Sequence, residues 1–349
     1  MRFAAPLIAT ALTFVAGLAV FAALGTSPLE GIRVFFLSPL KDAYGVAELL
    51  LKASPLALIA IGLAIGFRAN VWNIGAEGQF IAGAIAGGGI ALHFEGSASP
   101  LLLPAMIVAG AVGGALWASI PAILRIRFNA SEILVSLMLV YIAQLVVSWL
   151  VHGPWKDPQG FNFPQTKMFD DAALLPTLVE GTRLNALFPI ALAAVLAGHV
   201  FMQKSFIGYQ MRVAGESEAA ARYAGYSTRR TIWAGMLAGG AMAGIAGIGE
   251  VAGPMGQLTE HVSNNYGFAA IIVAFVGRLN PVGILFASLL MALLYLGGEQ
   301  AQQYLNLPSS IAKVFQGMLL LFLLGCDVFV NYELRWPDAS KGRPSKQAS

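Results

Sequence analysis

Four polar side chains besides Arg68 lie in the short segment from Arg68 to Phe80, which has long apolar runs on both sides. The segment reads RANVWNIGAEGQF and includes Asn70, Asn73, Glu77 and Gln79. An ionised carboxylate inside a bilayer costs about 2.5 to 3.5 kcal/mol on insertion scales, so Glu77 needs a protein partner or water. Two roles remain open for it: accepting hydrogen bonds from backbone amides that fix a re-entrant turn, or lining a solute path. The path candidates are these four residues and Asn280, which ends a similar Arg-x-Asn turn.

A second polar segment, residues 203–230, is the longest stretch expected on the inner side of a membrane, and we call it the coupling segment. Residues 216–223 are rich in Ala, Glu and Arg, which are good helix formers. Gly225 follows where a helix would stop. The pattern predicts a short helix between Gly215 and Gly225. An ordinary basic loop, a segment that rests on anionic lipid and a docking surface for a cytosolic subunit all fit these residues.

Signs of catalysis are nearly absent. Residues 247–252, GIGEVA, match a dinucleotide fingerprint but end an apolar run instead of joining a strand to a helix. No Gly-Lys-Ser or Gly-Lys-Thr occurs, so a phosphate loop for ATP is missing. The histidines are scattered, and the single Cys326 cannot form an internal disulfide or a cysteine metal site. We expect a chain that is not an enzyme and that binds no metal or cofactor itself.

The composition shows what must hold these segments. Of 349 residues, 57% are hydrophobic and only 11% are charged, whereas a soluble domain carries about 25% charge. This deficit excludes a soluble enzyme, a nucleic-acid binder and a disordered scaffold. A spanning helix uses roughly 20 residues, so the chain has room for about ten. We predict an all-α polytopic membrane protein with spans near 4–24, 50–67, 75–94, 101–123, 133–151, 187–202, 231–249, 266–278, 281–297 and 310–330.

The distribution of basic residues gives an orientation. Cytoplasmic loops carry an excess of Lys and Arg, and most of the 21 basic residues fall inside if both termini are cytoplasmic. Residues 152–186, which we call the outer loop, then lie outside. The first apolar run is longer than a secretory signal, so we expect an uncleaved anchor. We predict one transmembrane domain, 1–330, and a polar cytoplasmic tail, 331–349.

Glycine is unusually frequent, with 39 residues, many at helical spacing. Small residues let helix backbones approach closely in lipid, where van der Waals packing replaces the hydrophobic effect. The residues allow either a tightly packed bundle or interfaces that slide during transport.

Taken together, these motifs resemble the permease subunits of ATP-binding-cassette (ABC) importers, in the branch that includes branched-chain amino acid, ribose and nucleoside permeases. Residues 73–79 (NIGAEGQ), 153–158 (GPWKDP) and 277–281 (GRLNP) are most similar to the nucleoside and simple-sugar subgroup. Residues 208–225 are similar to the segment that docks on the ATPase. The resemblance implies ATPase-coupling roles for Arg212, Gly215, Glu216, Glu218, Ala219, Ala220, Arg222, Tyr223 and Gly225.

The resemblance also implies partners and a location. It implies a multi-pass permease in the bacterial plasma (inner) membrane that forms the path for a small polar solute, a nucleoside or simple sugar. A cytosolic ATPase would bind ATP and Mg, an outer substrate-binding protein or lipoprotein would deliver the solute, and a second permease, identical or related, would complete the path. The chain would also contact membrane lipid. The resemblance implies no nucleic-acid partner. One alternative is a proton-coupled secondary transporter that uses Glu77. Another is a lipid-modifying membrane enzyme, but the sequence shows no cluster of His, Asp or Ser at catalytic spacing.

Overall fold

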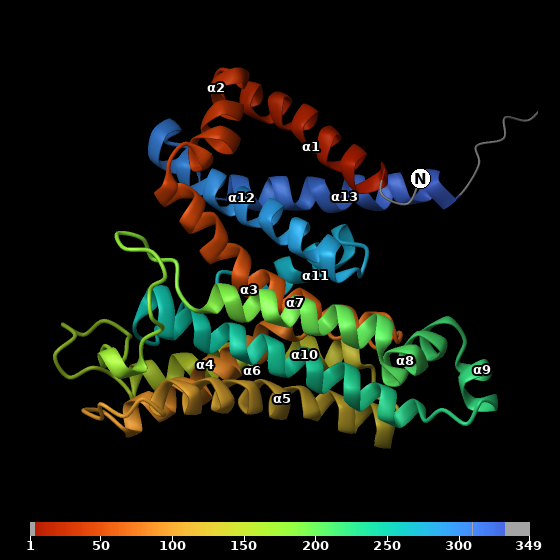
Figure 1. Cartoon of the computed structure of the whole chain (residues 1–349). Coiled ribbons are helices and arrows are strands. Elements are labelled where there is room, and N and C mark those ends of the chain that lie inside the picture. The colour runs from red at the N-terminus through yellow and green to blue at the C-terminus, as the bar shows by residue number, and fades with distance from the viewer. Residues whose placement is uncertain (1–3, 309, 332–349) are drawn as a thin grey trace, which may run out of the picture.

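The computed structural model describes residues 4–308 and 310–331, and helices form its fold (Figure 1). Ten of these helices coincide with the ten predicted spans, which confirms the all-α fold class. They are α1 (Ala4–Ala23), α3 (Ala43–Phe67), α4 (Ala76–His93), α5 (Leu102–Phe128), α6 (Glu132–His152), α7 (Leu187–Lys204), α10 (Thr228–Glu250), α11 (Tyr266–Val276), α12 (Pro281–Leu305) and α13 (Ile311–Asn331).

Seven helices within the described residues are long and apolar enough to cross a membrane: α1, α3, α5, α6, α7, α10 with its extension to Met255, and α12. The helix α11 and the described part of α13 are apolar but shorter. The helix α4 contains Glu77, Gln79 and several glycines, and it packs against α5, α6, α10 and α11. Because protein surrounds α4, its sequence does not have to be as apolar as that of a lipid-facing span.

Some element boundaries differ from the prediction. The helix α3 begins at Ala43, not near residue 50, because Asp42 caps it by accepting a hydrogen bond from the Gly45 amide at 2.7 Å. Glu48 and Lys52 therefore lie inside this helix. The elements that the apolar runs did not predict are α2 (Pro28–Ile32), η1 (Arg33–Leu37), η2 (Ser38–Leu40), η3 (Asp171–Ala173), α8 (Phe206–Glu216) and η4 (Val251–Met255).

The helices form two groups that α3 connects. Figure 1 shows α1, α2, α11, α12 and α13 on one side, and α4, α5, α6, α7 and α10 on the other. The helix α3 contacts α10 and α7 of one group and α11 and α12 of the other. The structure is thus a bundle whose two groups share one central helix.

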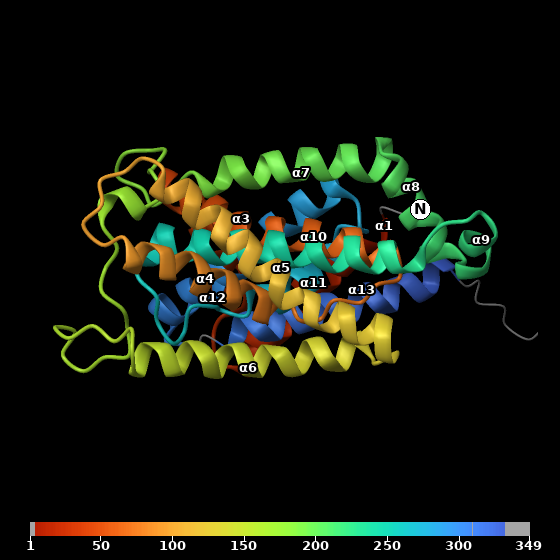
Figure 2. The same ribbon diagram turned by 90° about the horizontal axis from the view of Figure 1, so that it is seen from below.

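The two ends of the bundle carry different loops. Figures 1 and 2 both place α8 and α9 (Glu218–Tyr223) at one end and the outer loop at the opposite end. The start of α1 lies at the same end as α8 and α9 (Figure 1). The predicted polar tail, 331–349, lies outside the described residues apart from Asn331 and stays a prediction.

Glycines set the spacing around α10. A methyl group at Gly244 would lie 2.0 Å from the carbonyl oxygen of Gly110 on α5, and one at Gly247 would lie 2.0 Å from the carbonyl oxygen of Phe80 on α4. A Cβ atom would clash at these distances. The contacts of α10 with α5 and α4 at these two positions therefore require glycine. At these contacts the glycines permit close helix packing, which is one of the two roles that the sequence left open.

Candidate functional site

The polar segment 68–75 is an irregular connection between α3 and α4, and we call it the re-entrant segment after the turn that the sequence suggested. Its chain turns at Asn70, whose φ of 55° is left-handed, and the Val71 amide donates to the Gly66 carbonyl at 3.0 Å. The Asn70 Oδ1 atom accepts a hydrogen bond from Trp72 Nε1 at 2.7 Å. The Trp72 ring lies against Phe67 and Phe275, with centroids 5.3 and 6.0 Å away. Asn70 thus shapes the turn.

The side-chain amides of Asn73 and Gln79 form two hydrogen bonds with each other. The Asn73 Nδ2 atom donates to Gln79 Oε1 at 2.8 Å, and Gln79 Nε2 donates to Asn73 Oδ1 at 2.9 Å. Asn73 Oδ1 also accepts from the Gly75 amide at 3.1 Å. Both side chains are buried. This reciprocal pair fixes the start of α4 where the backbone lacks helical hydrogen bonds.

Glu77 connects the re-entrant segment to α11. Its Oε2 atom accepts a hydrogen bond from the Gly267 amide at 2.7 Å, in the first turn of α11. A carboxylate is favourable there because the first amides of a helix are unpaired and the helix dipole is positive at that end. Gly267 permits the approach, since a methyl group there would lie 2.2 Å from the Glu77 amide nitrogen. Glu77 thus accepts a hydrogen bond from a backbone amide, but the amide belongs to α11 and not to the turn itself.

Glu77 also borders a polar cavity of about 310 Å³, together with Gln144, Ser148, Glu260, His261 and Ser263. The Ser148 hydroxyl donates to Glu260 Oε1 at 3.0 Å, which joins α6 to the segment after η4. Apart from Glu77, these residues are not among those that the sequence motifs indicated. Gln144 and Ser148 stand four positions apart in an apolar helix, and this spacing places two polar groups on one face. That signal was available in the sequence.

Asn280 lies apart from this cavity. Its Oδ1 atom accepts a hydrogen bond from the Val282 amide at 3.0 Å and caps α12. It borders a different, mostly apolar cavity with His199 and residues of α1 and α12. The five path candidates therefore do not form one site. Of the five, only Glu77 lines the 310 Å³ cavity, because Asn70, Asn73, Gln79 and Asn280 use their side chains in local turns and caps.

The coupling segment contains two helices where we predicted one. The helix α8 includes Gly215 and ends at Glu216, and α9 begins at Glu218. The predicted start at Glu216 is wrong, because the Ser217 hydroxyl accepts a hydrogen bond from the Ala220 amide at 3.2 Å and begins a new helix there. The predicted stop is confirmed: Gly225, with a φ of 77°, ends α9.

The predicted coupling residues have different environments. A methyl group at Gly215 would lie 2.0 Å from the Arg68 carbonyl oxygen, so this glycine seats α8 directly against the re-entrant segment. Arg212, also on α8, donates from Nη2 to the Met202 carbonyl at 3.4 Å. On α9, Ala221 is buried and Tyr223 is 98% exposed. The exposed members are Arg212, Glu216, Glu218, Ala219, Ala220, Arg222, Tyr223 and Gly225.

The α9 surface combines an exposed ring with small side chains. Glu218 and Arg222 form an exposed ion pair at 3.3 Å, which contributes little to stability. Tyr223 is a large aromatic group that no part of the described chain covers. Aromatic residues of this kind are enriched in protein interfaces. Within the described residues, no three His, Cys, Asp or Glu side chains gather as a metal site.

Comparison with known proteins agrees with these features. The profile of the family described as the permease component of branched-chain amino acid transport systems matches residues 45–324. A glucose ABC transporter permease protein, TsgB13 of Haloferax volcanii, is 37% identical and the match covers 93% of this chain and 88% of the relative. The nucleoside ABC transporter permease protein NupB of Lactococcus lactis is 31% identical, with 91% and 89% covered.

A third relative extends the same pattern. The guanosine ABC transporter permease protein NupP of Bacillus subtilis is 31% identical, and the match covers 91% of this chain and 92% of the relative. Since the family profile and these relatives each match most of the chain, the protein belongs to the family of permease components of branched-chain amino acid transport systems, and its role is transport and not catalysis.

Proposed function

We propose that this chain forms the path for a nucleoside or simple sugar in an ATP-driven importer, and that α9 is the helix on which the cytosolic ATPase docks. The observation that carries the proposal is the position of α9: it is exposed at one end of the bundle, and α8 connects it to the re-entrant segment through Gly215. A push on α9 would therefore reach the start of α4 and the Glu77 contact with α11.

The relatives support the solute class and the partners. Permeases named for glucose, nucleosides and guanosine all match nearly the whole chain. An ABC permease works with an ATPase and a substrate-binding protein, and a second permease, identical or related, would complete the path. The end that carries the outer loop would receive the binding protein. We place the chain in the plasma (inner) membrane with both termini cytoplasmic.

The proton-coupled alternative has less support. It requires Glu77 to release and take up a proton in each cycle. In the structure, the Glu77 carboxylate accepts a hydrogen bond from the Gly267 amide, so its ionised form has a structural partner. The relatives are also named as ABC transporter permeases, and transporters of this kind are driven by ATP instead of a proton gradient.

Two substitutions on the coupling segment test the proposal. Gly225→Pro should leave the protein in the membrane but abolish transport and stimulation of the ATPase, because proline requires a φ near −65° while Gly225 has 77°. Tyr223→Ala should weaken ATPase docking by about 2 kcal/mol, as for an aromatic interface anchor. ATPase activity and solute uptake of the reconstituted complex are the measurements.

Matched variants separate docking from damage to the fold. Gly181→Pro is the control for Gly225→Pro, since Gly181 has a similar φ of 74° and lies in the outer loop. It should leave ATPase stimulation intact. Tyr223→Phe, which keeps the ring, should restore most of the activity that Tyr223→Ala loses. Normal uptake by Gly225→Pro would refute the placement of the ATPase on α9.

A further inference from the structure

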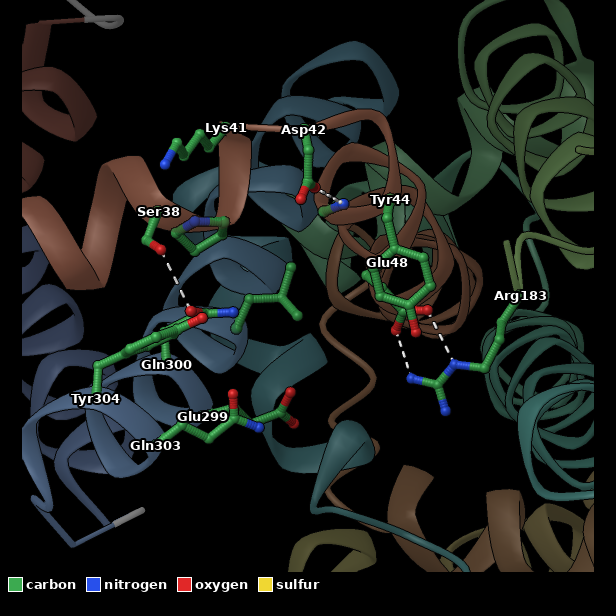
Figure 3. Close-up of a pocket in the computed structure, with 13 residues that line it drawn as sticks. Ser38, Lys41, Asp42, Tyr44, Glu48, Arg183, Glu299, Gln300, Gln303 and Tyr304 are labelled. Carbon is green, nitrogen blue, oxygen red and sulfur yellow. Dashed lines mark hydrogen bonds and ion pairs between the residues drawn. The ribbon is translucent and has the colours of Figure 1, made fainter. Parts of the chain in front are cut away.

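A polar cavity of about 570 Å³, whose lining residues are drawn in Figure 3, includes Arg183 and so lies at the end of the bundle that carries the outer loop. It shares no lining residue with the cavity beside Glu77. Its walls come from three parts of the chain: the start of α3 with η2, the outer loop at Arg183, and the last turns of α12. A volume of this size is typical of a site for a small molecule.

Two ion pairs hold these walls together. Arg183 donates from Nε to Glu48 Oε1 at 2.9 Å and from Nη2 to Glu48 Oε2 at 2.6 Å. This hydrogen bonding raises the pKa of Arg183 above its ordinary value. Beside the cavity, Lys52 Nζ lies 2.9 Å from Glu299 Oε1. The Glu48 side chain is only 6% exposed, so its charge requires the Arg183 partner.

These ion pairs leave the cavity polar and nearly neutral. Its charged residues are Lys41, Asp42, Glu48, Arg183 and Glu299, and Lys52 offsets Glu299 from the adjacent turn of α3. Acidic and basic groups thus balance. A cavity without excess charge discriminates against ions, because an ionic solute would lose its hydration without a compensating charge.

Other side chains in the cavity remain available to a ligand. Gln300 Oε1 accepts from the Ser38 hydroxyl at 3.3 Å, and Figure 3 shows Gln300, Gln303 and Tyr304 along one wall. Amide groups both donate and accept, which suits hydroxyl groups that do the same. Tyr44 and Tyr304 are 48% and 66% exposed, and their rings offer apolar faces to a sugar ring or a base.

We propose that this cavity is a binding site for a neutral, polyhydroxylated solute, with Gln300 and Gln303 as hydrogen-bonding contacts. The proposal rests on the proposed function and adds to it a solute site in the permease itself. Glu48 and Arg183 are positioning residues, because their charged groups bind each other and hold the walls. The site lies at the end where we expect the solute to arrive.

Solute protection of an engineered cysteine tests the site. In a Cys326→Ala background, Gln303→Cys is placed in the cavity, and Gln302→Cys is the control on the same helix because Gln302 is exposed and does not line the cavity. Membrane vesicles that hold the permease with its ATPase are labelled with a membrane-impermeant maleimide. At ten times the Kd, D-glucose or guanosine should slow labelling at position 303 about tenfold and leave position 302 unchanged.

Further arms test the contacts and the charge preference. Gln300→Ala, added to Gln303→Cys, should raise the solute concentration for half-protection about three- to tenfold. Equal protection by glucose 6-phosphate would overturn the inferred preference for neutral solutes. Uptake by the complete transporter without any protection at position 303 would overturn the site and leave the proposed function standing. If the complete transporter takes up neither glucose nor guanosine, the proposed solute class fails.

Discussion

The buried polar residues of the re-entrant segment and of the first turn of α4 have identifiable partners. Asn73 and Gln79 pair through both amide groups, and Glu77 accepts from the Gly267 amide. These residues stand out in the sequence because polar groups are costly inside a membrane. The partner of Glu77 could not be predicted, since Gly267 lies 190 positions away and only the folded chain brings the two together.

Substitution of Glu77 separates its structural contact from a proton-carrying role. Glu77→Ala leaves the Gly267 amide without its acceptor and should destabilise the protein by about 1 to 3 kcal/mol. Glu77→Gln keeps an acceptor oxygen and should stay close to the native stability and transport activity. Thermal unfolding in detergent and solute uptake are the measurements. Loss of uptake by a stable Glu77→Gln protein would instead favour proton coupling.

At the scale of elements, the sequence predicted where helices lie better than where they begin and end. Long apolar runs predicted all ten large helices, since a span must be apolar where it meets lipid. The start of α3 was missed because Glu48 interrupts the apolar run, and its partner Arg183 comes from a distant segment. The helix α8 has no long apolar run, so hydropathy gave no signal for it.

The packing of α10 against α5 depends on glycine. Gly244→Leu would place its Cβ 2.0 Å from the Gly110 carbonyl oxygen, so the two helices would have to separate. We expect destabilisation of at least about 1 to 3 kcal/mol, as for an overpacked core. The yield of monodisperse protein in size-exclusion chromatography and the melting temperature would both fall.

The matched control for this substitution lies on α13. Nothing lies within 4 Å of the position that a Cβ at Gly317 would occupy. Gly317→Leu should therefore behave like the native protein in the same assays. Equal loss of stability in the two variants would show that leucine substitution itself, and not the α10–α5 contact, is responsible.

At the scale of the whole molecule, the functional features are divided between two ends. The exposed α9 lies at one end and the outer loop at the other (Figures 1 and 2). The 570 Å³ cavity lies at the end of the outer loop, because Arg183 of this loop lines it. The Glu77 contact with α11 and its cavity lie among the helices. This separation suits a transporter in which a motor acts on one side and a solute enters on the other.

The distribution of Lys and Arg predicts which end faces the cytoplasm, and cysteine labelling in cells tests it. Phe161 of the outer loop and Tyr223 of α9 are 94% and 98% exposed, so a cysteine at either position is accessible to reagent. In a Cys326→Ala background, an impermeant maleimide should label Phe161→Cys in intact cells. Tyr223→Cys should react only after the membrane is permeabilised. The opposite pattern would put α9 outside the cell, where no cytosolic ATPase could reach it, and would remove the basis for coupling through this helix.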